Sequence, residues 1–215
     1  MSSSQHSSIT HGQKSSSYST KHTSISTTIT TSPISLNVPD YELIQTLGSG
    51  SFGFVFSALD HKSNPPKKVA LKRIEKVGNT LSREYEILFD IKSCPHAVKL
   101  LDFYYSKNNQ NKLIQNIVFE YMDDNLENMI QAKYKNKDRF REKEIKLMIY
   151  QVLRGLDFIH GKNIVHRDLK PENLLWKRGG VVKICDFGSS KYIDPNGQNT
   201  PYIVSRYYRA PELIW

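Results

Sequence analysis

The sequence predicts an α+β fold, with antiparallel strands in its first part and helices in its second. Two observations lead to this prediction. Short runs of aromatic and β-branched residues, bounded by glycine, proline and asparagine turns, lie between residues 41 and 74 and again at 114–122. Further along the chain, residues 144–160 carry apolar side chains at helical spacing. Strands that come first and helices that come later favour α+β over the alternating order of a parallel α/β sheet.

The strand region begins with three predicted strands, at 41–47, 52–58 and 69–74. The turn sequences GSGS and HKSNPPKK separate them, so we expect an antiparallel meander. A short amphipathic helix is predicted at 80–91, with Leu81, Tyr85 and Leu88 along one side. The sequence IQNIVFEYM at 114–122 then predicts a further strand.

The helix predicted at 144–160 is the clearest element of the chain. Its apolar side chains recur at helical spacing, at Ile145, Met148, Ile149, Val152, Leu153, Leu156 and Ile159. This stripe predicts that one face of the helix packs against a core.

Composition indicates a globular protein and excludes several classes. Of the 215 residues, 38% are hydrophobic and 11% aromatic, which is enough to form a core. No apolar run approaches the ~18 residues of a membrane span, and the N-terminus lacks a signal-peptide stretch, so we expect no membrane partner. Two scattered cysteines, Cys94 and Cys185, predict neither disulfides nor a cysteine metal site and favour a reducing compartment, cytoplasmic or also nuclear.

The formal net charge of +9 suggests an anionic partner. No dense basic run with interleaved aromatic residues supports nucleic acid, so an acidic or phosphorylated protein is the better interpretation. Nothing in the sequence indicates an oligomeric state.

Composition changes near residue 39. Between Met1 and Ser35, 20 residues are serine or threonine, and the first acidic residue is Asp40. Such a segment buries too little apolar surface to offset the entropy of ordering it. We therefore predict a disordered tail at 1–38 and one globular domain at 39–215. The tail has no arginine, which makes a transit peptide the weaker interpretation.

The sequence GSGSFG places Gly48, Gly50 and Gly53 in a G-x-G-x-x-G pattern, which alone also suits a plain glycine-rich hairpin. A dinucleotide site requires a helix after the loop and an acid about 20 residues on. Here the strand sequence FVFSAL follows, and Lys72 stands 19 residues after Gly53. Backbone amides without side chains can close over a triphosphate while a lysine holds its charge.

A buried lysine near phosphates needs an anionic partner. A lone glutamate on a helix is usually solvated, but Glu84 stands on the first predicted helix after Lys72, so we interpret it as that partner. The sequences VHRDLKPENLL and ICDFGSSK add Asp168, Lys170, Asn173 and Asp186. Phosphoryl transfer needs such groups: oxygen ligands for magnesium, a cation for the transferred group and an acceptor for the substrate proton.

Together these motifs resemble the eukaryotic protein kinases. The matching sequences are GSGSFGFV, VALK ending at Lys72, HRDLKPEN, DFG, and APE at 210–212, and the resemblance extends over residues 40–215. It implies a two-lobed fold that binds ATP and Mg²⁺, with an N-lobe at about 40–121 and a C-lobe that starts at about 122. The catalytic residues implied are Asp168, Lys170, Lys72 and Glu84, with the metal ligands Asn173 and Asp186.

The resemblance also implies an adenine site in VFEYM, with Phe119 as gatekeeper and the backbone of Glu120 and Met122 as hydrogen-bonding groups. The residues expected to enclose the adenine ring are Val55, Ala70 and Leu175. A stacked apolar column would consist of Leu88, His166 and Phe187. All of these apolar residues suit an ordinary core equally well.

In this family APE lies midway along the catalytic domain, so we expect the C-lobe to be truncated after APE. The stripe on 144–160 would then lose much of its cover, and a chain that ends there would itself be inactive. The alternative is a short product that acts as a non-catalytic binding module. Because every catalytic position is intact, we favour a serine/threonine protein kinase.

Within the kinases, VKICDFGSSK and YIVSRYYRAPELI are most similar to the glycogen synthase kinase/shaggy family of the CMGC group. The alternative is a MAP-kinase-like enzyme, because TPY at Thr200–Tyr202 resembles a dual-phosphorylation lip. In such families Arg83, Arg167 and Lys191 converge on one phosphate. The shaggy interpretation fills this pocket with a phosphate four residues C-terminal to the acceptor of a protein substrate. The MAP-kinase interpretation fills it with phosphorylated Thr200.

Overall fold

The computed structural model describes residues 40–50, 53–76, 78, 82–194 and 205–214. The chain divides into two units, residues 1–34 and 35–215, and every described residue belongs to the second. The tail predicted at 1–38 lies outside the described residues, as do Thr200 and Tyr202.

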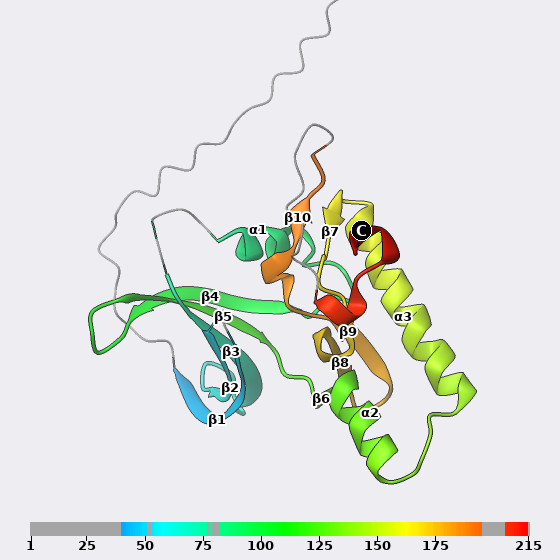
Figure 1. Ribbon diagram of the computed structural model, residues 1–215. Coiled ribbons are helices and arrows are strands. Elements are labelled where there is room, and N and C mark those ends of the chain that lie inside the picture. Colours follow the sequence, from blue (N-terminus) through cyan, green and yellow to red (C-terminus); the bar gives the residue numbers. More distant parts are fainter. Residues whose placement is uncertain (1–39, 51–52, 77, 79–81, 195–204, 215) are drawn as a thin grey trace, which may run out of the picture. The chain divides into compact units, whose positions relative to one another are not determined.

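An antiparallel five-stranded sheet forms the first part of the described unit (Figure 1). Its strands are β1 (Tyr41–Gly50), β2 (Gly53–Asp60), β3 (Lys67–Glu75), β4 (Leu100–Lys107) and β5 (Leu113–Glu120). They lie in the order β1-β2-β3-β5-β4, and each neighbouring pair is antiparallel. The predicted meander of three strands is therefore confirmed.

Strand β4 was not predicted from the sequence. It lies at an edge of the sheet, and its side chains are partly exposed on both faces, apart from buried Ser106. A strand of this kind has no clean alternation of apolar and polar residues, which is the signal that sequence analysis uses.

Helix α1 (Arg83–Asp90) is shorter than the predicted helix at 80–91. Its buried residues are Glu84, Ile87 and Leu88. The prediction that Leu81, Tyr85 and Leu88 form the apolar side of this helix is therefore only partly correct. Leu81 lies outside the described residues, and Tyr85 packs its ring against Phe103 at the half-buried edge. The helix turns this way because Glu84 points inward to a lysine of β3.

Among the residues described after β5, two segments are α-helical, α2 (Leu126–Lys135) and α3 (Glu142–His160). Short strands surround the loops beside them: β6 (Asp124–Asn125), β7 (Ile164–Val165), β8 (Leu174–Lys177), β9 (Val181–Ile184) and β10 (Lys191–Tyr192). The described residues of this part also form four 3-10 turns, at Pro171–Asn173, Phe187–Ser189, Arg206–Tyr208 and Pro211–Leu213. Helix α2 was missed because Leu126 is its single buried residue, which leaves no apolar period to read.

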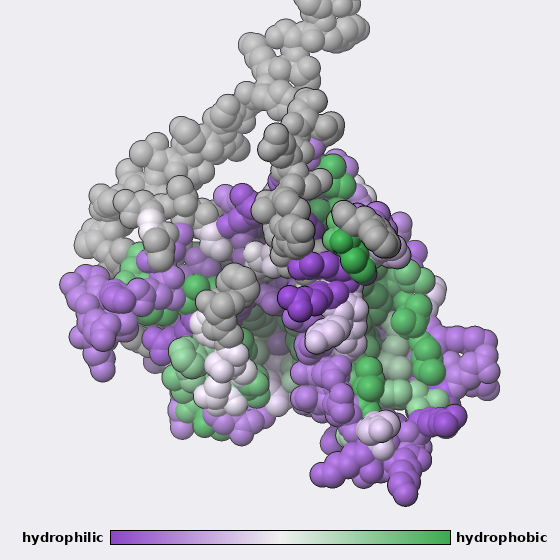
Figure 2. Space-filling view, viewed as in Figure 1, coloured by the Kyte–Doolittle hydropathy of each residue, from purple (hydrophilic) through white to green (hydrophobic). Residues whose placement is uncertain are grey.

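Helix α3 matches the predicted helix closely, but only part of its apolar stripe is covered. Val152 and Ile159 are buried, whereas Ile145, Ile149 and Leu153 are 46%, 52% and 58% exposed. Figure 2 shows hydrophobic residues at the surface along this helix. The expectation that the stripe is poorly covered therefore holds for one side of the helix.

One core cluster joins both parts of the unit. It includes Ile87 and Leu88 of α1, Ile117 of β5, Ile159 of α3 and Ile184 of β9. A smaller cluster consists of Ala58, Val69, Leu71 and Val118 within the sheet. Among the described residues, no helix combines the length and apolar character needed to cross a bilayer.

Candidate active site

A cavity of about 480 Å³ lies between the sheet and the loops that follow β5 and β7. Of the residues predicted to bind nucleotide, those that line it are Gly48, Gly53, Val55, Ala70, Lys72, Phe119, Glu120, Met122 and Leu175. Gly50 ends β1. The wall also includes Leu47, Val98 and Cys185, which the sequence analysis did not single out as binding residues. A concave, largely apolar site with a few polar groups suits a small ligand.

The glycine-rich hairpin requires glycine at one position for a steric reason. Gly53 has a φ of +117°, and a Cβ atom there would lie 2.1 Å from the Arg73 carbonyl oxygen of the neighbouring strand. At Gly48 a Cβ atom would meet nothing within 4 Å, so the hairpin has open space beside the cavity that it lines. Space next to exposed backbone is what a phosphate chain needs in order to approach the amides closely.

A buried lysine with two carboxylate partners stands at the inner end of the cavity. Lys72 Nζ donates to Glu84 Oε1 at 2.7 Å and to Asp186 Oδ1 at 3.0 Å. Strand β3 supplies the lysine, α1 supplies Glu84, and the loop after β9 supplies Asp186. The structure thus brings together three residues from different parts of the chain. The sequence analysis expected Glu84 as the partner of Lys72, whereas the contact between Lys72 and Asp186 was not predicted.

Electrostatics keep Lys72 charged. Burial lowers the pKa of its ammonium group, but the carboxylates of Glu84 and Asp186 outweigh burial, and the net pKa is raised above its ordinary value. The lysine is therefore a fixed positive charge at neutral pH, held at its inner side by carboxylates and open to the cavity. A fixed cation of this kind can bind a polyphosphate.

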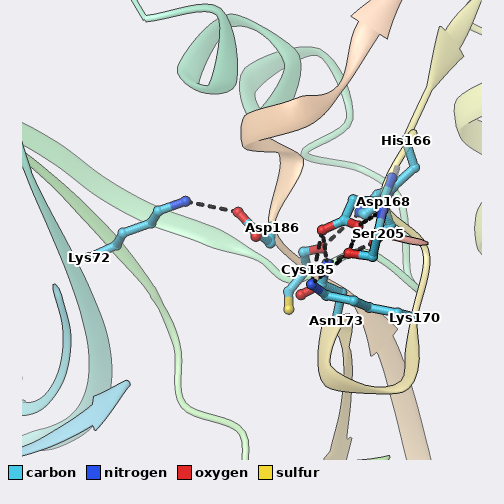
Figure 3. A network of polar contacts seen from close by, with 8 residues as sticks. All are labelled: Lys72, His166, Asp168, Lys170, Asn173, Cys185, Asp186 and Ser205. Atoms are coloured by element: carbon cyan, nitrogen blue, oxygen red, sulfur yellow. Dashed lines mark hydrogen bonds and ion pairs between the residues drawn. The ribbon is translucent and has the colours of Figure 1, made fainter. Parts of the chain in front are cut away.

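Asp168 is the centre of a second polar network (Figure 3). Its carboxylate accepts from Ser205 Oγ at 2.6 Å and from Asn173 Nδ2 at 3.2 Å, and Lys170 Nζ lies 3.2 Å away. Lys170 Nζ also donates to Ser205 Oγ at 3.1 Å. The predicted catalytic residues Asp168 and Lys170 and the predicted metal ligand Asn173 are thus adjacent.

Asp168 is ionised at neutral pH. Burial raises the pKa of its carboxyl, but hydrogen bonds from Ser205 and Lys170 more than offset burial and lower the pKa below its usual range. An ionised carboxylate that accepts hydrogen bonds can accept one from a substrate hydroxyl as well.

Ser205 is a site residue that the sequence analysis missed. Its backbone N–H and its hydroxyl both donate to Asp168, so it connects the segment before APE to the carboxylate. The available signal was its place in SRYYRAPE, a sequence that had been used only to assign the kinase group.

The predicted magnesium ligands fit that role. Asn173 and Asp186 line the same cavity. Asn173 Nδ2 donates to the Asp168 carbonyl oxygen at 2.8 Å, which directs its nitrogen to the protein and leaves the amide oxygen as the group for a ligand. One carboxylate and one amide oxygen suit Mg²⁺, which keeps several waters and takes substrate phosphates as further ligands. The described residues contain no cluster of three or more histidine, cysteine or acidic side chains of the kind that holds a metal by protein ligands alone.

His166 fixes the backbone between the two polar networks. Its Nε2 lies 2.8 Å from the Cys185 carbonyl oxygen, and its Nδ1 accepts from the Asp168 N–H at 3.3 Å. A carbonyl only accepts, so Nε2 carries the proton and the ring is neutral. Burial lowers the pKa of His166, which agrees with this state. The ring also meets Phe187 edge-on at 5.1 Å, and Leu88 belongs to the same core cluster.

The segment after β5 carries the predicted adenine-binding groups. The Glu120 N–H donates to the Lys99 carbonyl oxygen at 3.0 Å, so this N–H is not the group that binds a ligand. The Glu120 carboxylate accepts from the Lys99 N–H at 2.8 Å and from Lys183 Nζ at 2.5 Å. These contacts hold this strand end against β9, and Met122, two residues on, is buried in the cavity wall.

The three predicted phosphate-pocket cations lie on three different elements. Arg83 begins α1, Arg167 precedes Asp168, and Lys191 lies on β10, which pairs with Val165. Arg167 Nε donates to the Ser189 carbonyl oxygen at 2.7 Å. Burial and then the nearby Arg83 charge lower the pKa of Arg167. Two guanidinium groups that repel each other favour an anion between them.

These features define a class of protein. Antiparallel strands with a glycine-rich hairpin, a lysine–glutamate–aspartate cluster and a separate aspartate with lysine and asparagine are the parts that phosphoryl transfer to a protein requires. Residues 41–215 match the protein kinase domain family. The chain belongs to the protein kinase family.

Among protein kinases, several relatives of this chain are glycogen synthase kinases by name. Protein kinase gsk3 of Schizosaccharomyces pombe is 39% identical over 177 residues, 81% of this chain and 45% of that protein. Glycogen synthase kinase 1 of Pyricularia oryzae is 39% identical over 177 residues, 81% of this chain and 44% of that protein. Serine/threonine-protein kinase RIM11/MSD1 of Saccharomyces cerevisiae is 35% identical over 189 residues, 85% of this chain and 48% of that protein.

The resemblance to glycogen synthase kinases, stated from sequence motifs, is confirmed by these relatives. The chain spans between 35% and 55% of the length of the curated relatives it matches.

Proposed function

We propose that the intact protein is an ATP-dependent serine/threonine protein kinase of the glycogen synthase kinase type. The observation that carries the proposal is the Lys72–Glu84–Asp186 cluster in one cavity with Asn173, adjacent to an ionised Asp168. Serine/threonine specificity is supported by the names of relatives such as RIM11/MSD1.

Each residue has a distinct task in this proposal. Lys72, held by Glu84, binds the phosphates of ATP from the inner end of the cavity, and the glycine-rich hairpin closes over them. Asn173 and Asp186 hold Mg²⁺, which neutralises phosphate charge and orients the terminal phosphoryl group.

Asp168 accepts a hydrogen bond from the substrate hydroxyl and takes its proton as the new P–O bond forms, while the bond from the γ-phosphorus of ATP to the β-phosphate oxygen breaks and ADP leaves. Lys170 lies beside it and stabilises the negative charge on the transferred group. Ser205 orients the Asp168 carboxylate through the 2.6 Å hydrogen bond.

A matched pair of substitutions tests the chemistry in the full-length protein. Asp168→Asn keeps the shape but loses the acceptor, and we expect phosphate transfer to a serine peptide to fall by ~10²–10³. Asp157→Asn, on the exposed side of α3, makes the same change away from the cavity and leaves the rate unchanged. We expect Asp168→Asn to bind ATP as well as the wild type does, because the lysine and the glycine-rich hairpin are unchanged. Full activity of Asp168→Asn would refute the assignment. ATP binding without any transfer by the wild type would favour the binding module.

We further propose that the enzyme prefers substrates already phosphorylated four residues C-terminal to the acceptor. Support comes from the proximity of Arg83 and Arg167, whose charges repel in the absence of an anion. Lys191, on the strand after DFG, supplies the third cation.

The test compares a primed peptide with its unphosphorylated twin. We expect preference for the primed peptide to be lost in Arg83→Ala and kept in Thr200→Val. Equal rates on both peptides, with activity abolished by Thr200→Val, would instead support the MAP-kinase-like alternative activated at Thr200 and Tyr202.

A further inference from the structure

Helix α1 carries Glu84, yet little in its own sequence stabilises it. It has eight residues, and its N-cap residue Ser82 makes no side-chain capping hydrogen bond. Isolated helices shorter than about 12 residues are marginal in water. The position of α1, and with it the Lys72–Glu84 ion pair, therefore depends on contacts with other elements.

The C-terminal end of α1 carries an acidic residue where the helix dipole favours a basic one. Asp90 is the last helical residue, and the last turn contains no basic residue. The partial negative charge at a helix C-terminus repels a carboxylate there. A residue that is unfavourable within its own helix needs a compensating contact from elsewhere.

Tyr192 supplies that contact. Its hydroxyl donates to Asp90 Oδ2 at 2.6 Å, across 102 positions of sequence. The tyrosine ring packs against the main core cluster, so the hydroxyl is presented from a supported side chain. Burial and the hydrogen bond to Asp90 raise the pKa of the Tyr192 hydroxyl, which therefore stays protonated and remains a donor.

The backbone that carries Tyr192 is itself tied to the strand before the catalytic loop. Tyr192 pairs with Ile164 in the β7–β10 ladder, and the Ile193 N–H donates to the Asn163 carbonyl oxygen at 2.7 Å. Strand β7 ends at Val165, directly before the His166–Asp168 segment. The contact between Tyr192 and Asp90 thus connects the helix that holds Lys72 to the segment that holds Asp168.

We propose that Tyr192 is a positioning residue that acts through Asp90: it holds the C-terminal end of α1 in the orientation in which Glu84 reaches Lys72. The Lys72 contact anchors the first turn of α1 and the Tyr192 contact anchors its last residue. With both ends anchored, the helix cannot swing away from β3. The effect on catalysis rests on the proposed kinase function, whereas the effect on α1 does not.

Hydrogen exchange in the full-length protein tests the positioning directly. Tyr192→Phe removes only the hydroxyl, and Asp90→Ala removes the acceptor at an exposed site. We expect Tyr192→Phe to speed amide exchange in residues 83–90 by about five-fold, which corresponds to about 1 kcal/mol. Asp90→Ala should speed it by less, because it also removes the repulsion between the carboxylate and the helix C-terminus. The double variant is expected to exchange no faster than either single variant, because both remove one contact. Exchange in α3 stays unchanged and serves as the internal reference.

Two further variants separate positioning from general stability. Asp90→Asn keeps an acceptor oxygen and should retain near-wild-type exchange in α1. Tyr134→Phe makes the tyrosine change at a residue that is 82% exposed and should alter nothing. Unchanged exchange in residues 83–90 of Tyr192→Phe, additive effects in the double variant, or equal acceleration in α3 would each overturn the proposal.

A kinetic measurement adds the functional consequence. We expect Tyr192→Phe to lower kcat by about five-fold with little change in the KM for a peptide, since the substrate site is untouched. If the wild type transfers no phosphate, the proposed function fails, and the exchange data still decide whether Tyr192 positions α1. If the wild type is active and Tyr192→Phe matches it in kcat and exchange, only the positioning role fails.

Discussion

Helices α1 and α3 are built in opposite ways. Helix α3 has 19 residues, and the Glu144 carboxylate accepts from the Arg141 N–H at 2.7 Å to stabilise its first turn. Helix α1 has eight residues, no side-chain cap and an acid at its C-terminal end. What holds α1 comes from elsewhere: Lys72 at its start, core contacts in the middle and Tyr192 at its end.

The comparison distinguishes α3, which its own sequence stabilises, from α1, whose position depends on contacts with residues of the site. A helix that its own sequence stabilises keeps its place whatever occupies the cavity. A helix that other elements hold depends on those elements, so α1 is expected to respond to substitutions of Lys72 or Tyr192 that leave α3 unchanged. Four predictions test this contrast.

The largest effect is expected from Lys72→Met, which removes the anchor of α1 and the phosphate-binding charge together. Glu84 is buried, so it is left without a partner and α1 loosens. We expect phosphate transfer to fall by ~10²–10³ and exchange to rise in α1 but not in α3. Lys67→Met, on the exposed start of β3, is the matched control. Activity above a tenth of the wild-type rate would contradict the assignment of Lys72.

The two sides of α3 should respond differently to the same truncation. Ile159 is fully buried, so Ile159→Ala is expected to lower the free energy of unfolding by ~2–4 kcal/mol. Ile149 is 52% exposed, so Ile149→Ala should change the free energy of unfolding by less than ~0.5 kcal/mol. Chemical denaturation of both variants measures this. An equal loss at Ile149 would mean that another segment or a partner covers that side.

A smaller effect is expected from His166, whose protonation should change the free energy of unfolding with pH. Its folded pKa is lowered by burial, so below about pH 6.5 the unfolded state binds a proton that the folded state resists. The free energy of unfolding should therefore fall as the pH drops below about 6.5. Above that pH, His166 should contribute no pH dependence to the free energy of unfolding. Stability measured against pH should lose this slope in His166→Gln. The exposed His160→Gln provides the matched comparison, and the same slope in wild type and His166→Gln would disprove the prediction.

The smallest effect is expected at the start of α3. Glu144→Ala removes the acceptor for the Arg141 N–H, and we expect exchange in the first turn of α3 to rise by about two- to five-fold. Helix α1 should not respond. A change in α1 exchange in this variant would show that the two helices are coupled, against the contrast drawn above.

The sequence by itself determined the fold class, the meander, the position of α3 to within two residues at its start, and the kinase motifs. These follow from signals that are local in the chain: alternation in strands, helical spacing in 144–160, and glycines and charges at fixed offsets such as Gly53 and Lys72. The glycine at position 53 shows how such a local signal predicts structure. The structure explains why this position is glycine, because its backbone angle and the neighbouring strand exclude any side chain there.

Tertiary structure alone decided which side of α1 is buried, where β4 and α2 lie, and the roles of Ser205 and Tyr192. Ser205 donates to Asp168 across 37 positions, and Tyr192 to Asp90 across 102. Hydrogen bonds between distant segments leave no periodic trace in the sequence, since each residue is ordinary in its own surroundings. Only when the sheet, α1 and the loop after β9 pack together do these groups come within bonding distance, and that packing defines the site.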